Sequence, residues 1–202
     1  MKTIKRNSVH YNFDPDNPVA CRCHIGDRIT FQTQDCFGGQ ILSEDDLCTD
    51  INMSYMNPCT GPLYVEEAEV GSVLEIFIEH IKPVSPGILT LIPREGVLMD
   101  YFNNPMTKLV EIKDGRIVFK KNVEVASKPH IGTIGTTYTG RIPTGRTGNH
   151  GGNMDCPCAT VGTKIYLPVF VKGGLLMMGD VHAAMGEGEI CIGVECAAEV
   201  II

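Results

Sequence analysis

The stretch LVEIKDGRIVFK, residues 109–120, carries the clearest fold signal in the chain. Apolar and polar residues alternate on either side of Asp114-Gly115, and this dipeptide readily adopts the positive φ angles of a two-residue hairpin turn. The same alternation recurs in residues 29–33, 72–81 and 164–171, as in half-buried strands. With 22 glycines and 12 prolines available for turns, the chain is predicted to be all-β, with sandwich-like antiparallel sheets and long Gly-rich functional loops.

The composition predicts an ordinary globular protein. A length of 202 residues, 43% of them hydrophobic, can form one well-packed core, so residues 1–202 are predicted to be a single domain. Residues 1–7 are basic but lead into no apolar segment, so we expect no secretory signal and a cytoplasmic location. No apolar run approaches the ~20 residues of a membrane span. A net charge of -7 without basic patches argues against nucleic acid and membranes as partners,.

The chain has nine cysteines, and an odd number cannot be fully paired in disulfides within one chain. Reduced thiols are therefore expected. The CRC and CPC pairs have one intervening residue, which is shorter than the C-x₂₋₄-C spacing of structural zinc sites. Most cysteines are therefore interpreted as small buried apolar residues. A cysteine nucleophile at Cys36, Cys156 or Cys158 is the less favoured hypothesis, because neighbouring carboxylates weaken a thiolate.

A polar, Gly-rich loop follows in residues 141–155, RIPTGRTGNHGGNMD. Its two adjacent glycines would let the backbone turn, so that His150 and Asp155 converge on one point as metal ligands. Asn153 adds a polar group, and His150 and Asn153 are also candidate catalytic residues. The alternative interpretation is a rigid loop whose Asn and Asp side chains satisfy one another.

A second polar cluster, GDVHAAMGEGE, occupies residues 179–189. If the preceding apolar strand continues, Asp180 and His182 lie two residues apart on the same face and can bind one cation. Such a mixed nitrogen and oxygen site favours zinc, whereas a carboxylate-dominated shell would suit calcium. Glu187 and Glu189 are candidates for accepting a proton from a metal-bound water. Their alternative role is a solvated acidic turn, and that of Asp180 and His182 is a hydrogen-bonded pair.

Several motifs resemble those of the acetamidase/formamidase family. They are PHIGTIG (129–135), IPTGRTGNHGGNMDCP (142–157), GTKIYLPVFVKGG (162–174) and GDVHAAMGEGE (179–189). TQDCFGGQI (33–41) and GPLYVEEAEVGSVLEI (61–76) are similar to motifs nearer the N-terminus of that family. The resemblance therefore covers nearly the whole chain in order.

The resemblance implies a β-rich homo-oligomer, a dimer or higher, that binds a divalent metal. It also implies hydrolysis of a small linear or cyclic amide, of the formamide or acetamide type, to a carboxylate and ammonia or an amine. The polar positions of the family fall on Asp35, His150, Asp155, Asp180 and His182. By itself, Asp35 would be interpreted as a strand-end cap.

Three departures from the family pattern bear on activity. Glu187 stands where an Asp is usual, and Cys158 stands where an acidic residue is common. Family members also commonly continue well past the strand that carries Asp180, so either those further elements are dispensable or a wall of the substrate site is absent. The two functional hypotheses are thus a metal-dependent amidase and a metal- or small-ligand-binding paralogue without turnover.

Overall fold

The predicted hairpin is present in the computed structural model, which describes residues 1–97 and 99–202. Strands β10 (Met106–Lys113) and β11 (Arg116–Lys120) pair antiparallel, with Lys113 opposite Arg116. Asp114 and Gly115 have φ angles of 49° and 71°, the positive values that a two-residue turn of this kind requires. The hairpin is extended by β12 (Val123–Ala126) on one side and by β9 (Gly87–Leu91) on the other.

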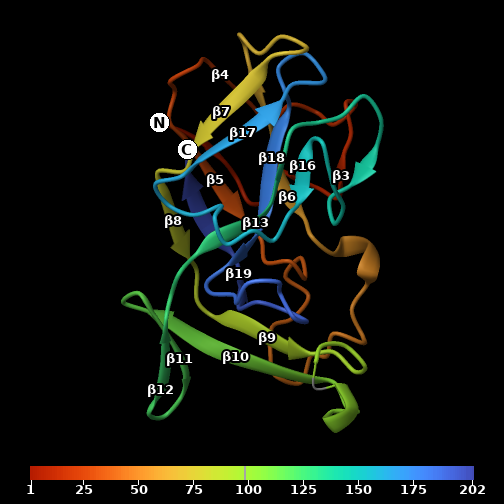
Figure 1. Cartoon of the computed structure of the whole chain (residues 1–202), viewed down its shortest axis with the longest axis vertical. Coiled ribbons are helices and arrows are strands. Elements are labelled where there is room, and N and C mark those ends of the chain that lie inside the picture. The colour runs from red at the N-terminus through yellow and green to blue at the C-terminus, as the bar shows by residue number, and fades with distance from the viewer. Residues whose placement is uncertain (98) are drawn as a thin grey trace.

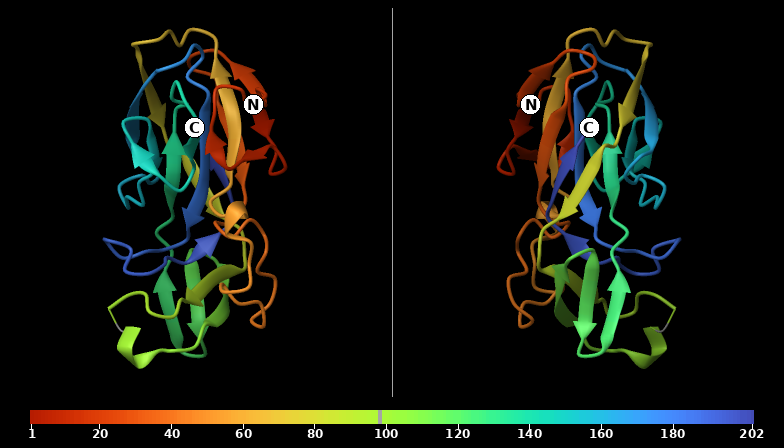
Figure 2. Two further views of the ribbon diagram at one scale, coloured as in Figure 1. Left: turned by 90° about the vertical axis from the view of Figure 1, so that its right-hand side faces the viewer. Right: turned by 90° about the vertical axis from the view of Figure 1, so that its left-hand side faces the viewer.

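This ribbon continues into the main body through one large sheet. From β9 the order runs through β19 (Glu195–Cys196), β18 (Leu176–His182), β13 (His130–Gly135), β16 (Gly151–Asn153) and β15 (Thr147–Gly148). Strand β6 (Cys59–Val65) pairs with β18, β2 (Val9–His10) and β4 (Cys21–Cys23). Figures 1 and 2 show the β9–β12 ribbon at one end of an elongated molecule, while both termini lie in the other half.

Smaller sheets pack onto the main body. One has the order β1 (Lys2–Ile4), β5 (Ile29–Thr33), β20 (Ala198–Ile201) and β8 (His80–Pro83). The others pair β7 (Val73–Phe77) with β17 (Lys164–Pro168), and β3 (Asn12–Phe13) with β14 (Ile142–Pro143). A continuous cluster of buried aliphatic residues joins β5, β6, β13, β18 and β20. The all-β, sandwich-like prediction is thereby confirmed.

Two strand pairs differ from the expected antiparallel arrangement, because β1 with β5 and β4 with β6 are parallel. Alternation along a strand indicates which face is buried but not the direction of its neighbour. Helical structure in the described residues comprises two short 3₁₀ turns, Met53–Tyr55 and Met99–Tyr101. Among these residues no helix has the length and apolar character needed to cross a membrane.

All nine cysteines are free thiols in the structure. Five of them, Cys23, Cys36, Cys48, Cys59 and Cys196, are buried and act as packing residues,. We therefore expect thiol titration of the denatured, non-reduced protein to recover all nine thiols, whereas recovery of only one or two would overturn the prediction of reduced cysteines.

Candidate metal centre

Strand β18 places two potential ligands side by side in the interior. It continues through His182, and the side chains of Asp180 and His182 are 4% and 1% exposed. His182 Nε2 lies 3.5 Å from Asp180 Oδ1. This is the same-face arrangement that the D-x-H spacing predicted.

Strand β19 adds a carboxylate that the sequence did not single out. Glu195 lies directly opposite His182 in the antiparallel β18–β19 pair, and its Oε1 is 3.1 Å from His182 Nε2. The residue is completely buried, and the backbone N–H of Gly193 donates to the same oxygen. The available signal was an acidic residue inside the apolar segment VECAA, residues 194–198, since a fully buried Glu needs a partner or a cation.

Two loops bring further carboxylates to this point. Asp155, His182 and Glu189 each offer one ligand atom, and these atoms all lie within 4.8 Å of one another. Backbone N–H of Asp155 donates to the carbonyl of Gly132 on β13, which holds the loop against the sheet. Residues that are about 30 positions apart in sequence thus meet in space, as metal sites generally require.

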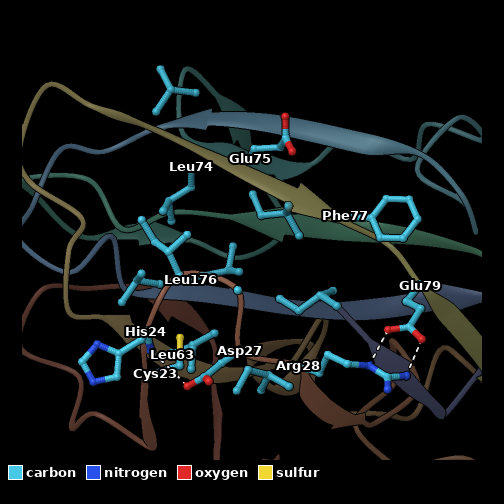
Figure 3. Close-up of a pocket in the computed structure, with 17 residues that line it drawn as sticks. Cys23, His24, Asp27, Arg28, Leu63, Leu74, Glu75, Phe77, Glu79 and Leu176 are labelled. Carbon is cyan, nitrogen blue, oxygen red and sulfur yellow. Dashed lines mark hydrogen bonds and ion pairs between the residues drawn. The ribbon is translucent and has the colours of Figure 1, made fainter.

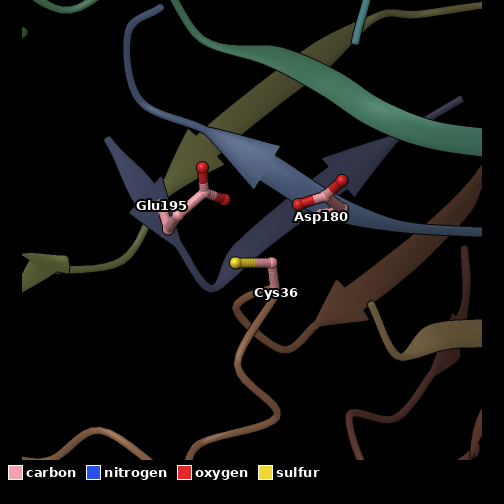
Figure 4. A group of neighbouring side chains, drawn as sticks. All are labelled: Cys36, Asp180 and Glu195. Carbon is pink, nitrogen blue, oxygen red and sulfur yellow. The ribbon is translucent and has the colours of Figure 1, made fainter. Parts of the chain in front are cut away.

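A second group of possible ligands consists of Cys36, Asp180 and Glu195. Cys36 Sγ and one carboxylate oxygen each from Asp180 and Glu195 also lie within 4.8 Å of one another, and all three residues are buried. Figure 4 shows the thiol between the two carboxylates. Burial and the charges of Glu195 and Asp180 raise the pKa of Cys36 well above its usual value, so without a cation this cysteine is a neutral thiol.

Burial also disfavours ionisation of the carboxyl groups. It raises the pKa of Glu195 to about 7 and, together with the charge of Asp155, that of Glu189 to about 8. The pKa of Asp155 is raised by burial and by Asp180. Asp155 Oδ1 and Glu195 Oε2 are buried without a hydrogen-bond partner among the described residues. Such a concentration of buried negative charge is the environment that a cation compensates.

His182 and His130 contact each other in a way that leaves Nε2 of His182 out of that contact. Burial alone would lower the pKa of His182, but Asp180 and Glu195 raise it to about 11. His182 Nδ1 lies 3.0 Å from His130 Nε2, and His130 Nδ1 lies 3.5 Å from the Lys128 carbonyl. Burial and His182 lower the pKa of His130 to about 4. If neutral His182 donates from Nδ1 to His130, its Nε2 lone pair is directed at the carboxylates, as in a metal-ligating histidine.

A polar layer orients Asp180. Thr133 Oγ1 is 3.2 Å from Asp180 Oδ2 and 2.6 Å from Asn153 Oδ1, so its single proton serves two acceptors. The amide of Asn57 donates to Asp180 Oδ2 at 3.4 Å. Asn153, a candidate catalytic residue, is therefore linked to Asp180 through the hydroxyl group of Thr133.

Three sequence-predicted residues lie outside both ligand groups of the described residues. His150 is buried edge-on against Phe13, with ring centroids 4.8 Å apart. Asp35 accepts hydrogen bonds from the backbone N–H groups of Phe37 and Gly39, as the strand-end cap would. Glu187 is exposed, and its charge acts on the neighbouring Cys158. Of the two candidate glutamates, the structure brings Glu189 to the cluster.

Gly132 provides a steric test of this centre. A Cβ at this position would lie 2.6 Å from the backbone oxygen of Asp180, 2.7 Å from Asp155 Oδ1 and 2.8 Å from Asp180 Oδ2. We expect Gly132→Ala to displace both carboxylates and to weaken zinc binding at least ~10-fold, as changes next to metal ligands do. Titration calorimetry with zinc measures the effect. Gly140→Ala, where an added Cβ meets nothing within 4 Å, should bind like wild type, and wild-type affinity in Gly132→Ala would contradict the assigned centre.

Comparison with known proteins agrees with these motifs. The model of the Acetamidase/Formamidase family matches residues 2–146 and 138–202. The formamidase of Methylophilus methylotrophus is 26% identical over 94% of this chain and 61% of its own length, and the acetamidase of Mycolicibacterium smegmatis is 25% identical over 94% and 63%. The chain thus spans less than two thirds of these curated relatives.

Solved structures extend the likeness to the whole fold. The acetamidase of Bacillus halodurans superimposes with a TM-score of 0.95 at 41% identity, over 98% of this chain and 68% of that one. A predicted acetamidase/formamidase of Thermoanaerobacter tengcongensis gives 0.94 at 38% identity, over 99% and 67%. The chain belongs to the acetamidase/formamidase family.

Proposed function

We propose that this protein hydrolyses a small linear or cyclic amide with the help of a divalent cation. The observation that carries the proposal is the cluster that half-buried Asp155 forms with the buried residues Asp180, His182 and Glu195. In it His182 Nε2, Asp155 Oδ1 and Glu195 Oε2 are buried without a hydrogen-bond partner among the described residues. An imidazole nitrogen among carboxylates favours zinc, and the nearby thiol of Cys36 also argues against calcium. Relatives named formamidase and acetamidase support an amide substrate.

The chemistry divides between the cation and the chain. When bound, a divalent cation polarises a carbonyl and lowers the pKa of water. His130 holds the imidazole of His182, and Thr133 holds the carboxylate of Asp180. Both side chains therefore keep a fixed orientation in the site. Glu189 lies at its edge with its side chain 21% exposed, and a pKa raised to about 8 suits a group that accepts a proton and then returns it to the leaving amine,. Glu189 is therefore proposed as the base in preference to Glu187.

A metal-binding paralogue without turnover is the second candidate. It is favoured by two departures from the family pattern, Glu187 where an Asp is usual and Cys158 where an acidic residue is common. Homo-oligomers and a cytoplasmic location are part of the proposal for either function.

Ammonia release from formamide and acetamide, with and without chelator, separates the candidates. The enzyme proposal expects release that disappears on chelation and returns with zinc. Bound zinc without any release across an amide panel would support the paralogue, and release that is insensitive to chelation would contradict the role of the metal.

A further inference from the structure

The CPC segment, residues 156–158, presents two thiols at the surface of the protein. Cys156 and Cys158 are exposed, whereas the other cysteines are partly or completely buried. Neither exposed thiol belongs to the two ligand groups that the described residues form around Asp180 and His182. Packing in the core therefore does not account for these two cysteines, which differ from the others in being open to reagents.

A tight turn brings the two residues together. The backbone N–H of Ala159 donates to the carbonyl of Cys156 at 2.9 Å, which closes a four-residue turn with Pro157 at its second position. The ring of Pro157 fixes one backbone angle of this turn. Cα atoms two residues apart span at most about 7 Å in an extended chain, and a turn shortens that span into the ~4.4–6.8 Å range found in disulfides.

Both ends of the turn are held by the buried strand β13. On one side the backbone N–H of Asp155 donates to the carbonyl of Gly132 at 3.1 Å. On the other side the backbone N–H of Ile131 donates to the carbonyl of Ala159 at 2.9 Å. Because the turn is anchored to adjacent residues of one strand, joining its two thiols costs little further chain entropy.

The two thiols also act on each other electrostatically. The charge of Cys156 raises the pKa of Cys158 more than any other influence does, and the charge of Glu187 makes a smaller contribution. Such an influence between exposed groups requires the two sulfur atoms to lie close together, because water screens charges that are farther apart. The thiols of this turn are therefore neighbours in space as well as in sequence.

The CRC pair has the same spacing but a different geometry. Cys21 and Cys23 lie in strand β4, where they pair with Leu63 and Val65 of β6. The extended backbone holds side chains at these positions roughly 6.5 Å apart, farther than the ~3.5–4.5 Å between the Cβ atoms of a disulfide. Cys23 is also only 4% exposed and lines an apolar cavity of about 490 Å³ (Figure 3). The same spacing thus permits ring closure in the turn and opposes it in the strand.

We propose that Cys156 and Cys158 are a redox-active dithiol, which forms a reversible disulfide by exchange with a low-molecular-weight disulfide. One cysteine thiolate attacks a sulfur atom of the small disulfide, forming a mixed disulfide and releasing one small thiolate. The second cysteine thiolate then attacks the protein sulfur of the mixed disulfide and releases the other. The protein loses two electrons and two protons, and the small disulfide is reduced to two thiols. The inference does not depend on amidase activity or on a metal.

The test uses oxidised glutathione in excess as the probe, added to the reduced, folded protein at about pH 8. Thiol titration after denaturation should find two thiols fewer than the nine of the reduced chain. The intact mass should fall by about 2 Da through the loss of two hydrogen atoms, and peptide mapping should place the disulfide between Cys156 and Cys158. Excess reduced glutathione should restore every thiol. An unchanged thiol count, a lasting glutathione adduct, a disulfide at other cysteines or a covalent dimer overturns the proposal.

Single substitutions test the assigned pair. Cys156→Ser and Cys158→Ser each leave one exposed thiol, so each variant should lose one thiol and retain a glutathione adduct, because no neighbouring thiol releases it. Cys21→Ser is the matched control, since it removes the more exposed member of the CRC pair, and it should lose two thiols without an adduct, like wild type. Loss of two thiols without an adduct in Cys156→Ser or Cys158→Ser, or an adduct on Cys21→Ser, would show that other cysteines react and that the assigned pair is wrong.

Discussion

Asp180→Asn is expected to lower zinc affinity at least ~10-fold and to reduce any amidase activity in parallel with zinc occupancy, because the amide keeps the shape of the side chain but removes its charge. Asp180 has a φ of 55°, a left-handed conformation that Asn tolerates as well as Asp. The backbone should therefore remain in place, so that a change in zinc binding reports on the charge.

Thermal melts with and without chelator complete this test. Asp114→Asn is the matched control, since Asp114 also has a left-handed φ of 49° but lies in the β10–β11 turn. It should bind zinc like wild type. Wild-type protein that melts at one temperature whether or not chelator is present would refute the metal centre, and Asp180→Asn would then lower stability by an amount that chelator does not alter.

Glu195→Gln is expected to change stability in opposite directions depending on the metal. In chelated protein the substitution removes a completely buried carboxylate, so the melting temperature should rise, by roughly 2–4 °C for each kcal/mol at this chain length. With zinc present the loss of a negative ligand should lower zinc affinity and with it the melting temperature.

The pKa of Glu195 predicts how the stability gain from Glu195→Gln varies with pH. The folded-state pKa of Glu195 is raised from 4.5 to about 7, so ionisation destabilises the chelated fold as pH rises above 4.5 and does so fully above 7. The gain from Glu195→Gln should therefore be absent below about pH 4.5 and largest near pH 8. Glu111→Gln, at an exposed position of β10, should show neither effect. A gain that is constant with pH would mean that the charge of Glu195 is not its cause.

Much of the fold could be predicted from local sequence. The hairpin at Asp114-Gly115 and strand β5 occur where alternation and turn residues indicated them. The parallel pairings of β1 with β5 and β4 with β6 could not be predicted, because alternation is the same for a parallel and an antiparallel neighbour. Their direction is decided by the shared core, which no single segment contains.

The candidate site divides in the same way. The sequence by itself determined that Asp180 and His182 share a face, because the two-residue period of a strand is a local property. Only the tertiary structure decided that Glu195 lies opposite His182, that Asp155 and Glu189 meet them, and that His150 packs against Phe13. These arrangements depend on strand register and loop packing between distant segments, which are fixed by burial in the folded molecule and leave no periodic pattern in the chain.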